Sequence, residues 1–300
     1  TNFVRPSMGS WINYGLGSES DDLPGFISIC PSPGNGGARN YGTAFLPPVY
    51  QGTPIGSAGK PAADTTIRDL VNRRYELSQQ REQFELLRSL NAEQLKRNPD
   101  DANLESVVSS LELAWRMQMH APEVLDLSRE TKNTQSLYGI DRPATKDYGR
   151  MCLLARRMCE AGVRFVQVNY ADNAPTPRWD QHSNLKQHEK HALATDQPVA
   201  ALLADLKERG LLEDTLVLWG GEFGRTPRIN ERQGTQSKRL QPGRDHWPSS
   251  MSFIVAGGGM RTGQVIGATN SRGEEPVSRP LSPNDLWASV YKHLGINYDD

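Results

Sequence analysis

The feature that most constrains the fold is an alternation of helical and extended patterns that starts near residue 144. The helical patterns cover residues 146–161, 193–209 and 282–294, and the extended apolar runs cover 163–170, 215–219 and 252–256. Gly162 is placed to end the first helix, and Ser282 followed by a proline is placed to begin the last one. The almost wholly apolar run at 215–219 is typical of a strand buried on both faces of a parallel sheet. The alternation predicts an α/β fold with right-handed crossovers.

The first half of the chain has a different pattern. Residues 1–65 are dense in Gly and Pro, which predicts turns and irregular structure. From residue 67 to residue 115 apolar side chains recur every three or four positions, with a polar break at 98–101. This spacing predicts a helical hairpin over about 66–120, within an insertion that extends over 66–135. We interpret residues 1–300 as a single α/β domain that carries this insertion.

The composition excludes several classes of protein. Lys and Arg number 34 against 35 Asp and Glu, without a run of like charges, so we expect neither nucleic-acid binding nor a polybasic membrane anchor. No apolar run approaches the roughly 18 residues of a membrane span. The 3 cysteines include no Cys-x-x-Cys pair, which argues against a disulfide framework or a zinc ribbon.

Three polar motifs lie next to the extended runs and carry side chains suited to metal and anion binding. The motifs are Trp179–Asn184, Gly221–Pro227 and Gly243–Pro248. Their candidate site residues are Asp180, His182, Glu222, Arg225, Arg244, Asp245 and His246. Because ligands bind beyond the carboxyl ends of the strands in open α/β sheets, we expect these side chains to converge.

The chemistry of these side chains allows two interpretations. Carboxylate with imidazole is the ligand mixture for Zn²⁺, Mn²⁺ or iron, whereas Ca²⁺ or Mg²⁺ would favour the oxygens. The guanidinium groups of Arg225 and Arg244 suit the oxygens of a phosphate or sulfate group. The spacing is equally compatible with surface turns whose Asp and His side chains make local hydrogen bonds. Both interpretations stay open at this point.

Longer stretches of sequence resemble the bacterial family called domain of unknown function 1501. These stretches are Arg5–Ser18, Leu153–Arg157 with Gly162–Val166, Trp179–Asn184, Gly221–Pro227 and Gly243–Trp247. The resemblance covers essentially the whole chain. The family is placed in the alkaline phosphatase and sulfatase superfamily, which implies a large α/β sandwich of a mostly parallel sheet between helices. It also implies a metal site at the carboxyl edge of that sheet.

The resemblance implies a role for each candidate ligand. Asp180, His182 and His246 resemble metal ligands of the superfamily, and Glu222 stands in place of an aspartate ligand. Asp245 is expected to bind the metal or to support a residue that does. Phe223 occupies the position of a further histidine ligand, so one divalent metal or an oxygen-richer site is as well supported as two zinc ions. The candidate ions are Zn²⁺, Ca²⁺, Mg²⁺ and Mn²⁺.

The resemblance also bears on what this chain contains. Family members usually carry the region of the superfamily's nucleophile upstream of the Arg5–Ser18 motif, often behind a twin-arginine export signal. We therefore expect this chain to be a fragment, and the nucleophile to be either absent from it or a metal-bound water. We expect the protein itself to be periplasmic or exported.

Three functions follow as expectations. The first is metal-dependent hydrolysis of a phosphate or sulfate ester on a small molecule or glycan, with Arg225 and Arg244 binding the anion. The second is a non-catalytic exported binding protein that retains the fold, for sulfated or phosphorylated glycans. The third is a protein that retains only the fold around a structural metal.

Overall fold

The computed structural model describes residues 4–34, 36–67, 70–72, 74–99, 102–174, 177–221, 224–234 and 238–297. The α-helices are α1 (Met8–Leu16), α2 (Leu77–Arg97), α3 (Ala102–Leu125), α4 (Lys132–Leu137), α5 (Lys146–Glu160), α6 (Gln187–Glu208) and α7 (Pro283–His293). The first strands are β1 (Phe26–Ile29), β2 (Thr53–Ile55), β3 (Phe165–Val168), β4 (Leu216–Gly220) and β5 (Gly224–Arg225). The others are β6 (Asn230–Gln233), β7 (Leu240–Gly243), β8 (His246–Trp247), β9 (Phe253–Gly257), β10 (Ala268–Thr269) and β11 (Pro276–Ser278). The chain divides into two compact units, residues 1–132 with 150–173 and residues 133–149 with 174–300.

The first unit contains a three-stranded parallel sheet in the order β2-β1-β3. Its central strand, β1, is buried along its whole length. Helix α1 approaches the sheet at Gly9, where a Cβ atom would collide with the rings of Phe26 and Phe165. These two rings meet edge to face with centroids 5.0 Å apart. Strands β1 and β2 were not predicted, because both are short and lie in the Gly- and Pro-rich first 65 residues.

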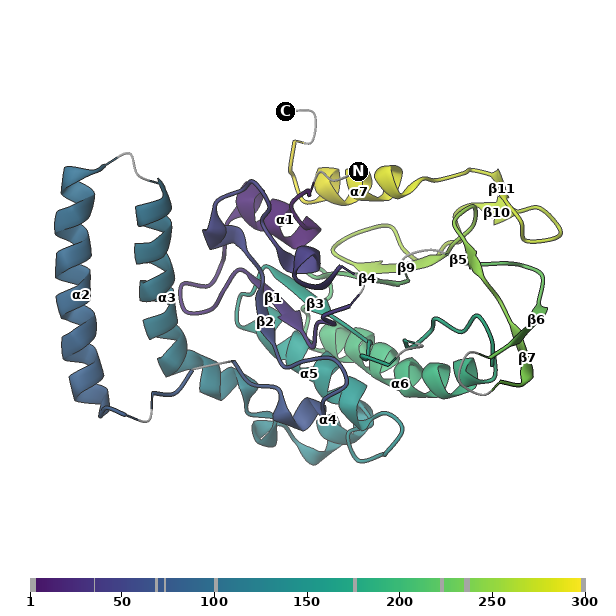
Figure 1. Cartoon of the computed structure of the whole chain (residues 1–300), viewed down its shortest axis with the longest axis horizontal. Helices are drawn as coiled ribbons and strands as arrows, with labels where there is room; N and C mark the ends of the chain where they lie inside the picture. The colour runs from purple at the N-terminus through teal and green to yellow at the C-terminus, as the bar shows by residue number, and fades with distance from the viewer. Residues whose placement is uncertain are drawn as a thin grey trace. The chain divides into compact units, whose positions relative to one another are not determined.

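Helices α2 and α3 form an antiparallel pair in the first unit, which confirms the predicted helical hairpin, although α3 extends beyond the predicted end near residue 120 to Leu125 (Figure 1). The rings of Phe84 and Trp115 stack between the helices at 5.2 Å. An ion pair also joins the two helices, with Arg88 Nε 3.4 Å from Glu112 Oε1. Helix α2 begins later than predicted, at Leu77, and has no buried residue. Phe84 of its apolar stripe contacts α3, whereas Leu87 and Leu90 of the same stripe are exposed.

The strand pairs that the structure describes in the second unit are all antiparallel. The predicted strands at 215–219 and 252–256 are present as β4 and β9, and they pair with each other, Leu218 opposite Val255. The residues of β4 are half-buried except for exposed Gly220. The prediction of a strand buried on both faces of a parallel sheet was therefore wrong for this segment. The cause is that an apolar run of five residues does not specify its neighbour or the direction of pairing.

The helix ends in the second unit follow the local sequence. Helix α7 begins after Ser282, whose Oγ accepts a hydrogen bond from Asp285 N at 3.3 Å, while Asp285 Oδ2 accepts one from Ser282 N at 2.7 Å. This reciprocal cap confirms the predicted start. Helix α6 begins at Gln187, six residues before the predicted start at Leu193.

The described elements establish a mixed fold of helices and strands with one small parallel sheet. None of the described helices is long and apolar enough to cross a membrane. All predicted site residues that the structure describes lie in the second unit, so this unit contains the candidate site.

Candidate metal centre

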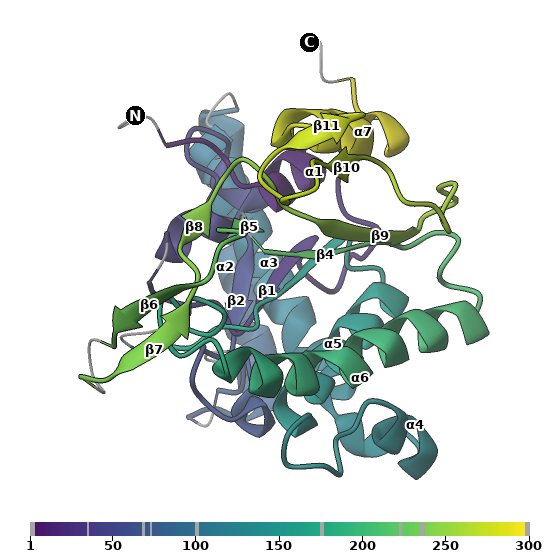
Figure 2. The ribbon, with the colours of Figure 1, turned by 90° about the vertical axis from the view of Figure 1, so that its right-hand side faces the viewer.

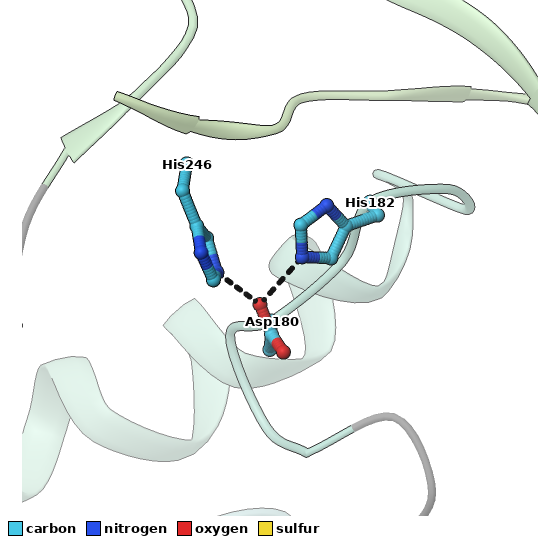
Figure 3. Close-up of side chains that lie close together, drawn as sticks. All are labelled: Asp180, His182 and His246. Atoms are coloured by element: carbon cyan, nitrogen blue, oxygen red, sulfur yellow. Dashed lines mark hydrogen bonds and ion pairs between the residues drawn. The ribbon is translucent and has the colours of Figure 1, made fainter. Parts of the chain in front are cut away.

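Three side chains of the types that bind metals meet in the second unit. Asp180, His182 and His246 each offer one ligand atom, and these atoms lie within 4.8 Å of one another. The Nε2 atoms of His246 and His182 are 2.8 and 3.1 Å from Asp180 Oδ1. Figure 3 shows the two imidazole rings flanking that oxygen. The predicted convergence is confirmed for these three residues.

Backbone pairing brings His246 to the loop that carries the other two side chains. Strands β5 and β8 pair antiparallel, which sets Arg225 opposite His246. Gly243, the last residue of β7, lies against the backbone carbonyl of His182, and a Cβ atom at this position would collide with that oxygen. Glycine is the residue that allows two backbone segments to approach this closely. The site therefore depends on a contact between the end of β7 and a loop about sixty residues earlier in the sequence.

Helix α6 anchors the loop that carries Asp180. Trp179 has a φ of 69°, a left-handed conformation that is strained for a bulky residue. Its ring lies 5.4 Å from the rings of both His188 and His191 on α6, and its carbonyl accepts a hydrogen bond from His188 Nε2 at 3.3 Å. Burial lowers the pKa of His188 and outweighs this hydrogen bond, so the neutral imidazole is favoured. These contacts hold Trp179, and with it the neighbouring Asp180, against the N-terminal part of α6.

Asp245 supports His182 and is not one of the three converging ligand groups. Its Oδ1 lies 2.7 Å from His182 Nδ1, and because an ionised carboxylate only accepts, Nδ1 is the donor. Its Oδ2 accepts a hydrogen bond from Asn230 Nδ2 at 2.9 Å and forms an ion pair with Arg232 Nη2 at 2.7 Å. The bond from His182 is the main cause that holds the pKa of Asp245 below its ordinary value, against burial. With Nδ1 bound in this way, His182 directs Nε2 toward Asp180.

Asp180 Oδ1 forms two hydrogen bonds, one with His246 Nε2 at 2.8 Å and one that it accepts from Arg225 Nη2 at 2.7 Å. Burial raises the pKa of Asp180, but the hydrogen bonds from Arg225 and His246 outweigh burial and leave the pKa below its ordinary value. The carboxylate is therefore ionised at neutral pH, the form that binds a cation.

The two predicted anion-binding arginines fasten the ligand-bearing loops to each other. Arg225 Nη1 donates to Arg244 O at 3.4 Å, and Arg244 Nη2 donates to Arg225 O at 3.1 Å. Arg244 Nε also donates to Thr226 O at 2.5 Å. This reciprocal contact fixes the register between β5 and the segment before His246.

Glu222 and Phe223, predicted as a ligand and as a departure from the superfamily pattern, lie outside the described residues. Asn230 and Arg232 were not predicted as part of the site. Their i, i+2 spacing, which places both side chains on one face of a strand, is the sequence signal that indicates a shared partner.

The fold and site together define a mixed α/β protein with a carboxylate–imidazole cluster supported by arginines. The model of the family described as protein of unknown function (DUF1501) matches residues 1–300. The chain therefore belongs to this family, as its motifs predicted. No curated protein and no solved structure gives a significant match.

Proposed function

We propose that this protein is a metal-dependent hydrolase of phosphate or sulfate esters, built on the sandwich fold of the alkaline phosphatase and sulfatase superfamily. The observation that carries the proposal is the convergence of Asp180, His182 and His246 on ligand atoms within 4.8 Å. The family membership supports it through the superfamily that the motifs resemble.

The donor set fits a divalent cation. Two imidazole nitrogens and one carboxylate oxygen are the three protein ligands typical of a zinc site that keeps a position open. His182 is already oriented by Asp245, an arrangement common for metal-binding histidines. Asp180, His182 and His246 would hold the ion, which when bound supplies charge stabilisation for the ester oxygens. The chain's own contribution is to hold these three side chains close together and to orient their ligand atoms.

The charges around the site favour an anionic substrate. Asp180 faces Arg225 at 2.7 Å and Asp245 faces Arg232 at 2.7 Å, so these two carboxylates and two guanidinium groups balance. With neutral imidazoles, a divalent cation leaves an excess of positive charge in the cluster. A phosphate or sulfate ester carries the compensating negative charge.

The proposal is tested on the full-length protein by elemental analysis of metal content and by turnover of aryl phosphates and aryl sulfates. We expect Asp180→Asn and His246→Gln to lose both the metal and the turnover. His120→Gln is the matched control, because this imidazole is 57% exposed and pairs with Asp22 in the first unit. Loss of metal in the control as well, or turnover that survives both site variants, would contradict the proposal. Metal bound without turnover would favour the non-catalytic binding protein.

A further inference from the structure

The β6–β7 hairpin, with the residues that flank it, concentrates positive charge in a chain that is nearly neutral. Between Gly224 and Trp247 the sequence has six basic residues, Arg225, Arg228, Arg232, Lys238, Arg239 and Arg244, against Glu231 and Asp245. The net charge of this stretch is thus +4, whereas that of the whole chain is −1. The overall balance of charge conceals a local basic surface.

Most of this charge faces solvent. Arg225 and Arg244 are used between the loops of the metal centre, but Arg228, Lys238 and Arg239 are exposed. Arg232 is 57% exposed although it pairs with Asp245. An exposed arginine or lysine on a hairpin has a small desolvation cost when it binds an anion. Its attraction to a polyanion extends over one Debye length, roughly 8 Å at physiological salt.

The hairpin is tied directly to the metal centre. Asn230 lies opposite Gly243 and Arg232 opposite Gln241, so both β6 side chains share one face. Asn230 donates a hydrogen bond to Oδ2 of Asp245, the residue that orients His182, and Arg232 forms an ion pair with the same oxygen. The only acid on β6, Glu231, lies on the opposite face. Figure 2 shows β6 and β7 extending beyond the β5–β8 pair, within the same unit.

We propose that this hairpin is an anion-binding arm and that the substrate is a glycan carrying several sulfate or phosphate ester groups. The proposal rests on the proposed function, because the ester to be hydrolysed sits at the metal centre while the arm binds further ester groups of the same chain. Arginine forks and lysine ammonium groups bind the oxygens of both kinds of ester.

The sequence of the arm argues for a glycan rather than a nucleic acid. Between Gly224 and His246 there is no Phe, Tyr or Trp. Proteins that bind single-stranded nucleic acids combine basic grooves with aromatic side chains on which the bases stack. This arm offers charge without stacking surfaces, which suits a ligand whose recognisable groups are its anionic esters.

The test compares two triple variants of the full-length protein. Arg228→Ala/Lys238→Ala/Arg239→Ala removes three cations from the arm and spares Arg232. Arg81→Ala/Lys96→Ala/Arg97→Ala removes three exposed cations from α2 and serves as the control with the same change in net charge. Binding of labelled heparin hexasaccharide and of a phosphorylated maltooligosaccharide is measured by fluorescence anisotropy at low and physiological salt, with melting curves to verify folding.

We expect the arm variant to bind one or both glycans about tenfold or more weakly, with a flatter salt dependence, and the control to change less than about twofold. Equal weakening in both variants, or a single-stranded oligonucleotide of the same charge that binds as tightly as the glycans, would overturn the proposal. The glycan that binds more tightly identifies the ester. Glycan binding is also measured in EDTA, where it should persist. A failure of the glycan-binding proposal can therefore be distinguished from a failure of the proposed metal-dependent activity.

Discussion

Replacing Asp245 by Asn tests whether this carboxylate holds His182 in its metal-binding orientation. Asp245 Oδ1 accepts a hydrogen bond from His182 Nδ1 at 2.7 Å, while Oδ2 accepts one from Asn230 and forms an ion pair with Arg232. An asparagine can still accept from His182 through its amide oxygen. Its NH₂ group then faces the Asn230 amide nitrogen and the Arg232 guanidinium group, and neither of these can accept a hydrogen bond from it. We expect the asparagine to turn or shift, and His182 to lose its fixed position.

The magnitude follows from the role of the residue. Loss of a group that orients a metal-binding histidine typically costs about 10- to 100-fold in metal affinity, or roughly 1.4–2.7 kcal/mol. We expect Asp245→Asn to fall in this range for Zn²⁺, because His182 keeps its place in the chain but loses a charged hydrogen-bond partner. Asp180 and His246 remain to bind the ion, so binding should weaken rather than vanish.

The assay is titration of the apo-protein with Zn²⁺ by calorimetry at neutral pH, with a competing chelator. Glu231→Gln is the control, because Glu231 is an exposed acid beside Arg232 in sequence and lies on the other face of β6. It changes the net charge by the same amount without touching His182. Unchanged Zn²⁺ affinity in Asp245→Asn, or an equal loss in Glu231→Gln, would refute the orienting role.

Two further predictions concern stability and the approach of the loops. Glu130→Gln should destabilise the protein by about 3 kcal/mol in chemical denaturation, because it leaves Arg156, whose side chain is 1% exposed, and Arg157 without this carboxylate. Burial raises the pKa of Glu130, but hydrogen bonds from these arginines hold the pKa below its ordinary value of 4.5. The contribution of Glu130 to the stability of the wild type is therefore present above pH 4.5 and is lost as the pH falls through the lower folded-state pKa. A variant that loses as much stability in acid as the wild type would contradict this. Gly243→Ala should reduce Zn²⁺ affinity at least tenfold, as measured by calorimetry, because its Cβ collides with the backbone carbonyl of His182; unaltered affinity would show that the two loops need not approach so closely.

The local features of the fold were predictable from the sequence, and the pairing of its strands was not. The start of α7 follows from Ser282 and Asp285, two residues whose hydrogen bonds are made within one turn. The pairing of β4 with β9 depends on contacts between segments about forty residues apart, about which an apolar run carries no information. The buried strand β1 has only four residues and follows a turn-rich segment, so its periodicity is too short to identify.

The site was predictable to the extent that its residues follow the ends of secondary structure elements. Asp180, His182 and His246 come from motifs that the sequence singled out, and they meet as expected. We expected them to meet because they lie near the carboxyl ends of strands in one open sheet, and this reason was partly wrong. Strand β3, which precedes Asp180, belongs to the parallel sheet of the first unit, whereas the site forms within the second unit. What brings the loops together is the β5–β8 pair and the contact at Gly243, and neither is visible in the spacing of the motifs.

The two arginines show most clearly what the structure adds. Residue type alone favours binding of a phosphate or sulfate oxygen, because a guanidinium group presents a planar fork of donors. In the structure Arg244 directs two of its nitrogens to the backbone carbonyls of Arg225 and Thr226, so its main role is to hold the loop of His246 in place. Arg225 differs, because its Nη2 donates to the same Asp180 oxygen that both imidazoles face. Of the two predicted anion-binding residues, Arg225 is therefore the one that contacts a candidate metal ligand, whereas the side chain of Arg244 contacts backbone carbonyls.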